Sequence, residues 1–119
     1  MEETFYPLTA TDTKSVKVRV DTSNNEVSAI PPVLHMGSGH FQFIEWTIET
    51  DGWAFPTFRQ GIELKVPNSQ FSNGSLNASN VFRISDTNLD EGDHDYTIRV
   101  VNPTTGEQLA LDPTIKNQG

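Results

Sequence analysis

Hydrophobic and polar residues alternate along much of the chain, most clearly in its last quarter. The alternating hydrophobic positions there are Tyr96, Ile98 and Val100, then Leu109, Leu111 and Ile115. A Pro-Thr-Thr-Gly turn at 103–106 separates the two sets. Because successive side chains of a strand point to opposite faces, residues 89–117 predict a half-buried β-hairpin.

Shorter alternating segments occur earlier in the chain. They predict strands at Val16–Val20, Ile62–Val66 and Phe82–Ile84, and a weaker strand at Glu26–Ile30 that Pro31 and Pro32 end. Eight of the fourteen residues from Pro67 to Asn80 are Ser or Asn, which predicts an irregular connection that crosses between sheets. No window of about 12 residues has helical spacing free of Pro or Gly, so no substantial helix is expected.

The segment from His40 to Thr50 has hydrophobic residues in both phases. Phe41 and Phe43 occupy odd positions, whereas Ile44, Trp46 and Ile48 occupy even ones. This pattern predicts either a bulge near Phe43 or a strand that is covered on both faces.

About seven short strands, separated by Gly, Pro, Asn and Asp, predict an all-β fold. Their spacing favours an antiparallel β-sandwich over alternating strands and helices. A length of 119 residues fits one domain with one core, and no linker or repeat divides residues 1–119.

The charge of the chain limits its partners. Sixteen acidic against eight basic residues give a net charge of -8, which repels nucleic acid and anionic lipid surfaces. The absence of cysteine excludes disulfides, thiolate metal sites and cysteine nucleophiles. An acidic start, Met1-Glu2-Glu3, and short apolar runs predict neither a signal peptide nor a membrane span, so we expect a cytoplasmic protein.

Residues near the C-terminal strands resemble immunoglobulin and fibronectin type III sandwiches. The resemblance rests on Leu89, Gly92, Tyr96, Ile98 and Val100, which are similar to the corner before the penultimate strand and to that strand's inner face. It implies an immunoglobulin-like antiparallel β-sandwich of about seven strands. It also implies that the Tyr96 hydroxyl bonds the backbone a few residues upstream and that Trp46 is the core tryptophan.

A narrower resemblance is to the DP-EP family, a small bacterial group of uncharacterised immunoglobulin-like proteins. It rests on Tyr96-Thr97-Ile98-Arg99-Val100 and on the tail from Leu111 to Asn117, and it covers about the last quarter of the chain. The resemblance implies a bacterial protein with this fold and implies no activity.

The acidic stretch from Asp86 to Asp95 is a candidate calcium site, because hard cations are bound by several oxygens from one loop. An EF-hand needs Gly at its sixth position and Glu at its twelfth, but these positions counted from Asp86 are Glu91 and Thr97. The alternative is a solvated turn in which Asp side chains bind their own backbone.

Other candidate chemistry is weak. His35 and His40 flank a loop, His94 is distant in sequence, and Gly37-Ser38-Gly39 precedes a strand rather than a helix. Because no nucleophile, metal-ligand set or acid-base pair stands out, we expect a protein that is not an enzyme and has no cofactor or metal.

The segment around Trp53, Phe55, Phe58 and Arg59 concentrates aromatic residues next to a turn. These side chains either form an exposed binding patch or cap the core. The leading hypothesis is a non-catalytic interaction or accessory module with a protein partner. It would bind through this loop, or by strand addition at the last strand, where Pro113 suits an edge.

The alternative hypothesis is a small-ligand domain for carbohydrate or calcium that uses the Trp53–Phe58 loop or the Asp86–Asp95 turn. The sequence leaves the oligomeric state open.

Overall fold

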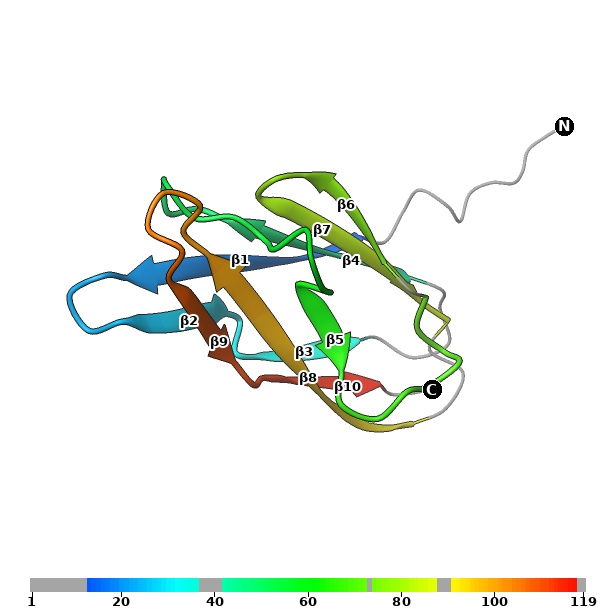
Figure 1. The fold of residues 1–119 in the computed structure, drawn as a ribbon. Helices are drawn as coiled ribbons and strands as arrows, with labels where there is room; N and C mark the ends of the chain where they lie inside the picture. Colours follow the sequence, from blue (N-terminus) through cyan, green and yellow to red (C-terminus); the bar gives the residue numbers. More distant parts are fainter. Residues whose placement is uncertain (1–12, 37–41, 73, 88–90, 118–119) are drawn as a thin grey trace, which may run out of the picture.

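The chain folds entirely as strands and turns over the residues that the computed structural model describes, namely 13–36, 42–72, 74–87 and 91–117 (Figure 1). The strands are β1 (Thr13–Asp21), β2 (Glu26–Ile30), β3 (Val33–Met36), β4 (Gln42–Ile48), β5 (Ile62–Leu64), β6 (Ser75–Ala78), β7 (Val81–Asp86), β8 (Gly92–Val101), β9 (Gln108–Leu111) and β10 (Thr114–Asn117). The prediction of an all-β protein is confirmed. The predicted number of about seven strands is wrong, because the described residues alone form ten.

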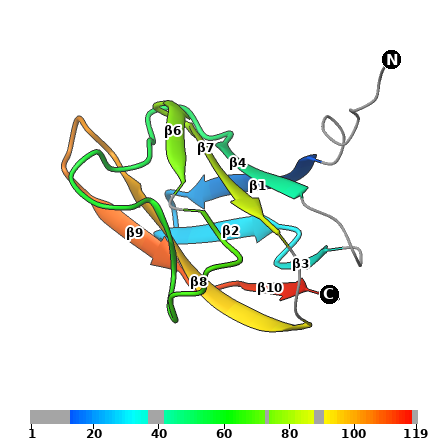
Figure 2. The ribbon, with the colours of Figure 1, turned by 90° about the vertical axis from the view of Figure 1, so that its right-hand side faces the viewer.

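The strands form two sheets, which lie as two layers in Figures 1 and 2. The first sheet has the order β2-β1-β4-β7-β6, and the second has the order β3-β10-β8-β5 with β9 also paired to β8. Most neighbours are antiparallel, but β1 runs parallel to β4 and β3 runs parallel to β10. Both sheets are therefore mixed, and the prediction of a purely antiparallel arrangement is wrong.

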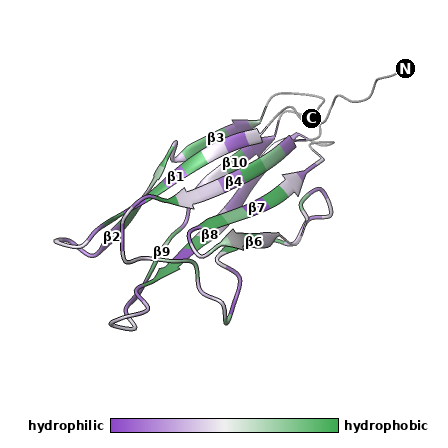
Figure 3. Cartoon of the chain, turned by 90° about the horizontal axis from the view of Figure 1, so that it is seen from above, coloured by the Kyte–Doolittle hydropathy of each residue, from purple (hydrophilic) through white to green (hydrophobic). Residues whose placement is uncertain are grey.

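The core fills the space between the sheets. Its side chains come from alternate strand positions, which explains the alternating hydropathy along the strands in Figure 3. The largest fully buried side chains include Trp46 of β4 and Tyr96 of β8, one from each sheet.

Strand β4 has no bulge. Its register with β7 runs without a shift from Gln42 opposite Asp86 to Thr47 opposite Val81. Phe43 lies on the outer face, where the Arg83 guanidinium sits 4.5 Å from the ring centroid. Of the two predicted alternatives the bulge is wrong. The outer face of β4 is instead partly covered, since Phe43 is half-buried under an arginine and does not turn into the core. Phe41 lies outside the described residues.

Strands β2 and β3 belong to different sheets although only Pro31 and Pro32 separate them. β2 pairs with β1 in the first sheet, whereas β3 pairs with β10 in the second. The Ile30-Pro31 peptide bond is cis. The prolines end β2 as predicted, but the chain then continues in the facing sheet as β3, which the sequence pattern did not predict.

Strands β9 and β10 continue one another along β8. The register of Ile98 opposite Leu111 passes without a shift into that of Asp95 opposite Thr114. Pro113 lies in the break, is buried, and accepts a bond from the Tyr96 N–H at 3.1 Å. The last strand, β10, lies between β3 and β8. The prediction that the last strand forms an edge is therefore wrong for β10.

The connection from Pro67 to Asn80 crosses between the sheets as predicted, because it links β5 of the second sheet to β7 of the first. It is less irregular than predicted. It contains β6, and its Phe71 forms an isolated bridge to Asp86.

Candidate functional site

Of the two alternatives for the aromatic residues at 53–59, burial in the core holds for Trp53 and Phe55 and exposure holds for Phe58. Trp53 and Phe55 are 6% and 2% exposed, whereas Phe58 is 63% exposed and Arg59 is also exposed. Two of the three aromatic rings therefore belong to the core, and of the four candidate residues Phe58 and Arg59 lie on the surface.

Backbone pairing explains the burial of the first two rings. Ala54, between them, exchanges two hydrogen bonds with Val101 of β8, at 2.9 and 2.8 Å. The Phe55 N–H donates to the Ser79 carbonyl at 2.9 Å, and the Phe55 ring packs edge-on against Phe82. This segment joins the two sheets at one side of the molecule, which turns Trp53 and Phe55 inward.

The described carboxylates of the predicted acidic turn, which do not include Asp90, do not converge. Asp86 is fully buried, whereas Asp93 bonds Lys116 at 3.3 Å and Asp95 accepts a bond from Thr114 at 2.8 Å on the opposite face. Residues 88–90 lie outside the described part of the chain. Among the residues that the structure describes, no three His, Cys, Asp or Glu side chains could hold a metal together.

Two of the three histidines can be placed. His35 is exposed on β3, and the ring of His94 packs edge-on against Phe71 with the centroids 5.0 Å apart. His40 lies outside the described residues. His35 and His94 thus come from different strands, with no contact between them that would suggest a shared ligand.

Tyr96 and Trp46 form a buried polar contact between the sheets. The Trp46 Nε1–H donates to the Tyr96 hydroxyl at 3.0 Å, and the ring centroids are 5.4 Å apart. Burial raises the pKa of Tyr96 to about 12, although the bond from Trp46 acts in the opposite direction. This bond joins residues 50 positions apart. The predicted corner bond to the backbone upstream of Tyr96 involves a segment that includes residues 88–90, which lie outside the described part of the chain.

A second buried contact, which we call the polar cluster, consists of Gln42, Gln70, Asp86 and Asn117. The Asn117 side-chain amide donates to Asp86 at 3.1 Å and to Gln70 at 3.3 Å. Gln42 lies opposite Asp86 across β4 and β7. The sequence signal is that Gln42, Asp86 and Asn117 share the phase of the inward hydrophobic residues of their strands.

Strand β5 leaves one edge of the second sheet open. The Arg99 N–H donates to Gly61 at 2.7 Å, and the Lys65 N–H donates to Asp95 at 3.0 Å. Backbone groups of a strand alternate in direction, so Gly61, Glu63 and Lys65 bond toward β8. The N–H and C=O groups of Ile62 and Leu64 therefore point away from β8, and no residue in the described part of the chain bonds them.

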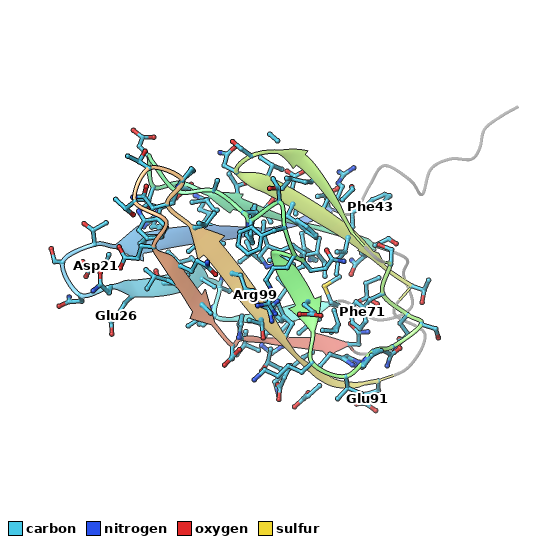
Figure 4. All side chains as sticks on the ribbon, in the orientation of Figure 1. Asp21, Glu26, Phe43, Phe71, Glu91 and Arg99 are labelled. Atoms are coloured by element: carbon cyan, nitrogen blue, oxygen red, sulfur yellow. The ribbon has the colours of Figure 1, made fainter. Side chains whose placement is uncertain are left out.

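A groove lies beside this edge. We call it the β5 groove; it has a volume of about 480 Å³, and its apolar lining comes from Ile62, Leu64, Phe71 and Ile84. Figure 4 places Phe71 next to β5. Gln60, Glu63 and the Pro67–Ser69 segment form much of its polar rim. Free backbone groups next to an apolar groove are the two features that strand addition uses.

The open edges of β2 and β9 are less suited to this role. β2 and β9 approach one another with Cα atoms within 8 Å, whereas a strand inserted between two others needs about 9–10 Å. The groove there is lined by Asp21 and Glu26, which are labelled in Figure 4, and so it is acidic.

Comparison with protein-family models and with curated proteins finds no match to this chain. Within the described residues there is no helix with the length and hydropathy needed to span a membrane.

Proposed function

We propose that this protein is a non-catalytic interaction module of immunoglobulin-like type that binds an extended peptide by strand addition at β5. The observation that carries the proposal is the outward direction of the Ile62 and Leu64 backbone groups beside the β5 groove. Two residues with one donor and one acceptor each offer four backbone hydrogen bonds to an added strand.

The immunoglobulin-like part of the proposal is supported by the strand order. The second sheet places the last strand, β10, next to β8, and β5 follows β8 on its other side. The chain changes sheets between β2 and β3, and Trp46 meets Tyr96 in the core. Membership of the DP-EP family and cytoplasmic residence stay predictions.

The β5 groove suits a peptide with hydrophobic residues at alternate positions. Backbone pairing to Ile62 and Leu64 aligns the added strand with the sheet, so that every second side chain faces Phe71 and Ile84. Apolar side chains at those positions lose water-exposed surface on binding, which provides the favourable free energy.

A second copy of this chain is a poorer occupant than a distinct peptide. Two-fold pairing of β5 with itself, centred on Glu63, would place two Glu63 carboxylates opposite one another. Like charges directly opposite in a sheet are destabilising. With a net charge of -8, the protein favours a peptide that carries Lys or Arg opposite Glu63.

The test uses a random 12-residue peptide library displayed on phage and selected on the wild-type protein. Enriched peptides are then measured against Leu64→Pro and Leu64→Ala. Proline removes the outward N–H without removing a bond to β8, and alanine removes the side chain but keeps that N–H. We expect binding to persist within about threefold in L64A and to fall about tenfold in L64P, because the backbone bond from the Leu64 N–H is lost.

Circular dichroism and thermal unfolding of both variants show whether each remains folded. Equal peptide affinity for L64P and L64A would reject pairing at β5, and enrichment of no peptide would reject a peptide-binding groove.

A carbohydrate platform has less support. Stacking on a sugar needs exposed aromatic faces, and Trp53 and Phe55 are buried.

A further inference from the structure

We propose that a hollow on the outer face of the second sheet binds a small aliphatic monocarboxylate. This two-arginine hollow has a volume of about 210 Å³ and is lined by Pro56, Arg59, Arg99, Val101, Leu109 and Ala110, among others. Arg99 and Ala110 are cross-strand partners on β8 and β9. The site is separate from the β5 groove and does not depend on peptide binding there.

Arg99 is held in a fixed position at this hollow. One terminal nitrogen, Nη1, donates to Glu63 at 2.7 Å and to the Gln60 carbonyl at 3.1 Å. Its side chain is only 21% exposed. A guanidinium has five N–H groups, so the three on Nε and Nη2 remain without a partner among the described residues. Arg99, labelled in Figure 4, is therefore a preorganised donor.

Arg59 supplies a second positive charge. Six of the eight basic side chains form ion pairs, namely Lys17, Arg19, Lys65, Arg83, Arg99 and Lys116. Within the part of the chain that the structure describes, Arg59 and Lys14 have no such partner. Arg59 thus has an uncompensated guanidinium at the hollow, and a bound anion would compensate it.

The chemistry of the lining selects the kind of anion. Planar guanidinium groups bind carboxylates through paired hydrogen bonds, and Pro56, Val101 and Leu109 provide apolar contact for a carbon chain. Glu63 beside Arg99 and the net charge of -8 oppose a dianion more than a monoanion. The hollow has room for roughly seven water molecules, which suits an acid of about six to eight non-hydrogen atoms.

The experiment is a ¹H–¹⁵N NMR titration of the full chain with hexanoate at low ionic strength. We expect saturable shifts of the amides around Arg59 and at 108–110, with Kd on the order of millimolar, as for other ligands of this size. Hexanamide, which has the same carbon chain without the charge, and inorganic phosphate are titrated in parallel and should bind at least fivefold more weakly.

Matched variants separate the local charge from the net charge. Arg59→Gln and Lys14→Gln each change the net charge from -8 to -9, but Lys14 lies on β1 in the other sheet. We expect Arg59→Gln to weaken hexanoate binding about five- to tenfold and Lys14→Gln to leave it unchanged within twofold.

A gain in affinity gives a readout that misfolding cannot mimic. Glu63→Gln removes the competing carboxylate while an amide oxygen can still accept from Arg99, so hexanoate should bind about two- to fivefold more tightly. Glu45→Gln on β4, in the other sheet, is the control with the same net charge, because Glu45 also pairs with an arginine, Arg83. Equal effects of the paired variants, equal binding of hexanamide, tighter binding of phosphate, or the absence of saturable shifts would each overturn the proposal.

Discussion

Tyr96 and Trp46 meet in the core, one from each sheet, and each provides a partner for the other's polar group. A buried indole N–H without an acceptor costs free energy, and so does a buried hydroxyl without a partner. The bond of 3.0 Å between them removes both costs at once. Their edge-on ring packing adds favourable contact across the sheets.

Tyr96→Phe should lower the free energy of unfolding at neutral pH by about 1–2 kcal/mol. The substitution keeps the ring but leaves the buried Trp46 N–H without its acceptor. Urea unfolding, followed by tryptophan fluorescence, measures the change. An unchanged midpoint and slope would mean that this bond contributes nothing to stability.

The stability of the wild-type protein should fall at alkaline pH. The folded pKa of Tyr96, about 12, is raised above the ordinary value of about 10, so its contribution is complete below pH 10 and is lost as the pH rises through 12. The full loss corresponds to roughly 3 kcal/mol. Unfolding curves between pH 9 and 12 measure it.

Tyr96→Phe is the control for this dependence. Tyr6, the other tyrosine, is present in both proteins, so the difference between their pH profiles isolates Tyr96. Parallel profiles would contradict a raised pKa at this position.

At the scale of elements, strands differ in how their open edges are protected. β3 follows two prolines, and β2 lies against β9. β5 is protected chiefly by its short length of three residues, which limits uncontrolled pairing while leaving two residues free.

Hydrogen exchange should distinguish the β5 amides that point outward from the one that bonds β8. The amides of Ile62 and Leu64 point away from β8 and should exchange faster than the amide of Glu63, which bonds toward β8, by at least tenfold. Exchange followed by NMR measures each amide separately. Equal protection at all three positions would contradict the assigned direction of the edge.

Gly74, just before β6, packs too tightly to accept a side chain. It has a φ of +71°, and an added Cβ would lie 2.5 Å from the Phe82 ring and 2.8 Å from Ile84. Gly74→Ala should lower the free energy of unfolding by about 2–4 kcal/mol. Gly106→Ala, with a φ of +79° but open space, should cost only about 1 kcal/mol. Thermal unfolding compares them, and similar losses would contradict the packing argument.

Alternation predicted most strands because each has one buried face. β1, β2 and β8 follow the predicted residues closely. It missed β3, which directly follows Pro31 and Pro32, and β6, which lies in a Ser- and Asn-rich segment at a sheet edge. It also could not reveal the parallel pairing of β1 with β4, since this depends on which strands become neighbours rather than on either strand alone.

The candidate site was harder to predict than the fold. The sequence predicts a strand at Ile62, but it does not say which strands lie at an edge. The burial of Trp53 and Phe55 depends on backbone bonds to Val101 and Ser79, both distant in the sequence. The same residue pattern was compatible with an exposed loop, so the sequence left both outcomes open.

For the whole molecule, the polar cluster is a connection between the two sheets and the crossover. Asn117 of β10 bonds Asp86 of β7 and Gln70 of the connecting segment. Buried polar groups that bond one another favour a single arrangement of the elements that carry them, because other arrangements leave them without partners.

Asn117→Ala should lower the free energy of unfolding by about 2–4 kcal/mol, since the buried Asp86 carboxylate and the Gln70 amide oxygen each lose a donor. Lys116→Ala is the control, because its ion pair with Asp93 is exposed and should contribute about 0–1 kcal/mol. Urea unfolding compares the two. Losses of similar size would show that the cluster does not hold the sheets together.

The interior position of β10 has a consequence for synthesis of the protein. Residues 114–117 are made after every other described strand, yet they lie between β3 and β8. While they are still inside the ribosome, β3 has no strand to pair with in its sheet. Residues 92–95 of β8 also lack the strand that pairs with them there. The second sheet can therefore form fully only after these residues emerge, and a nascent chain held at an earlier length should be open to proteases and chaperones.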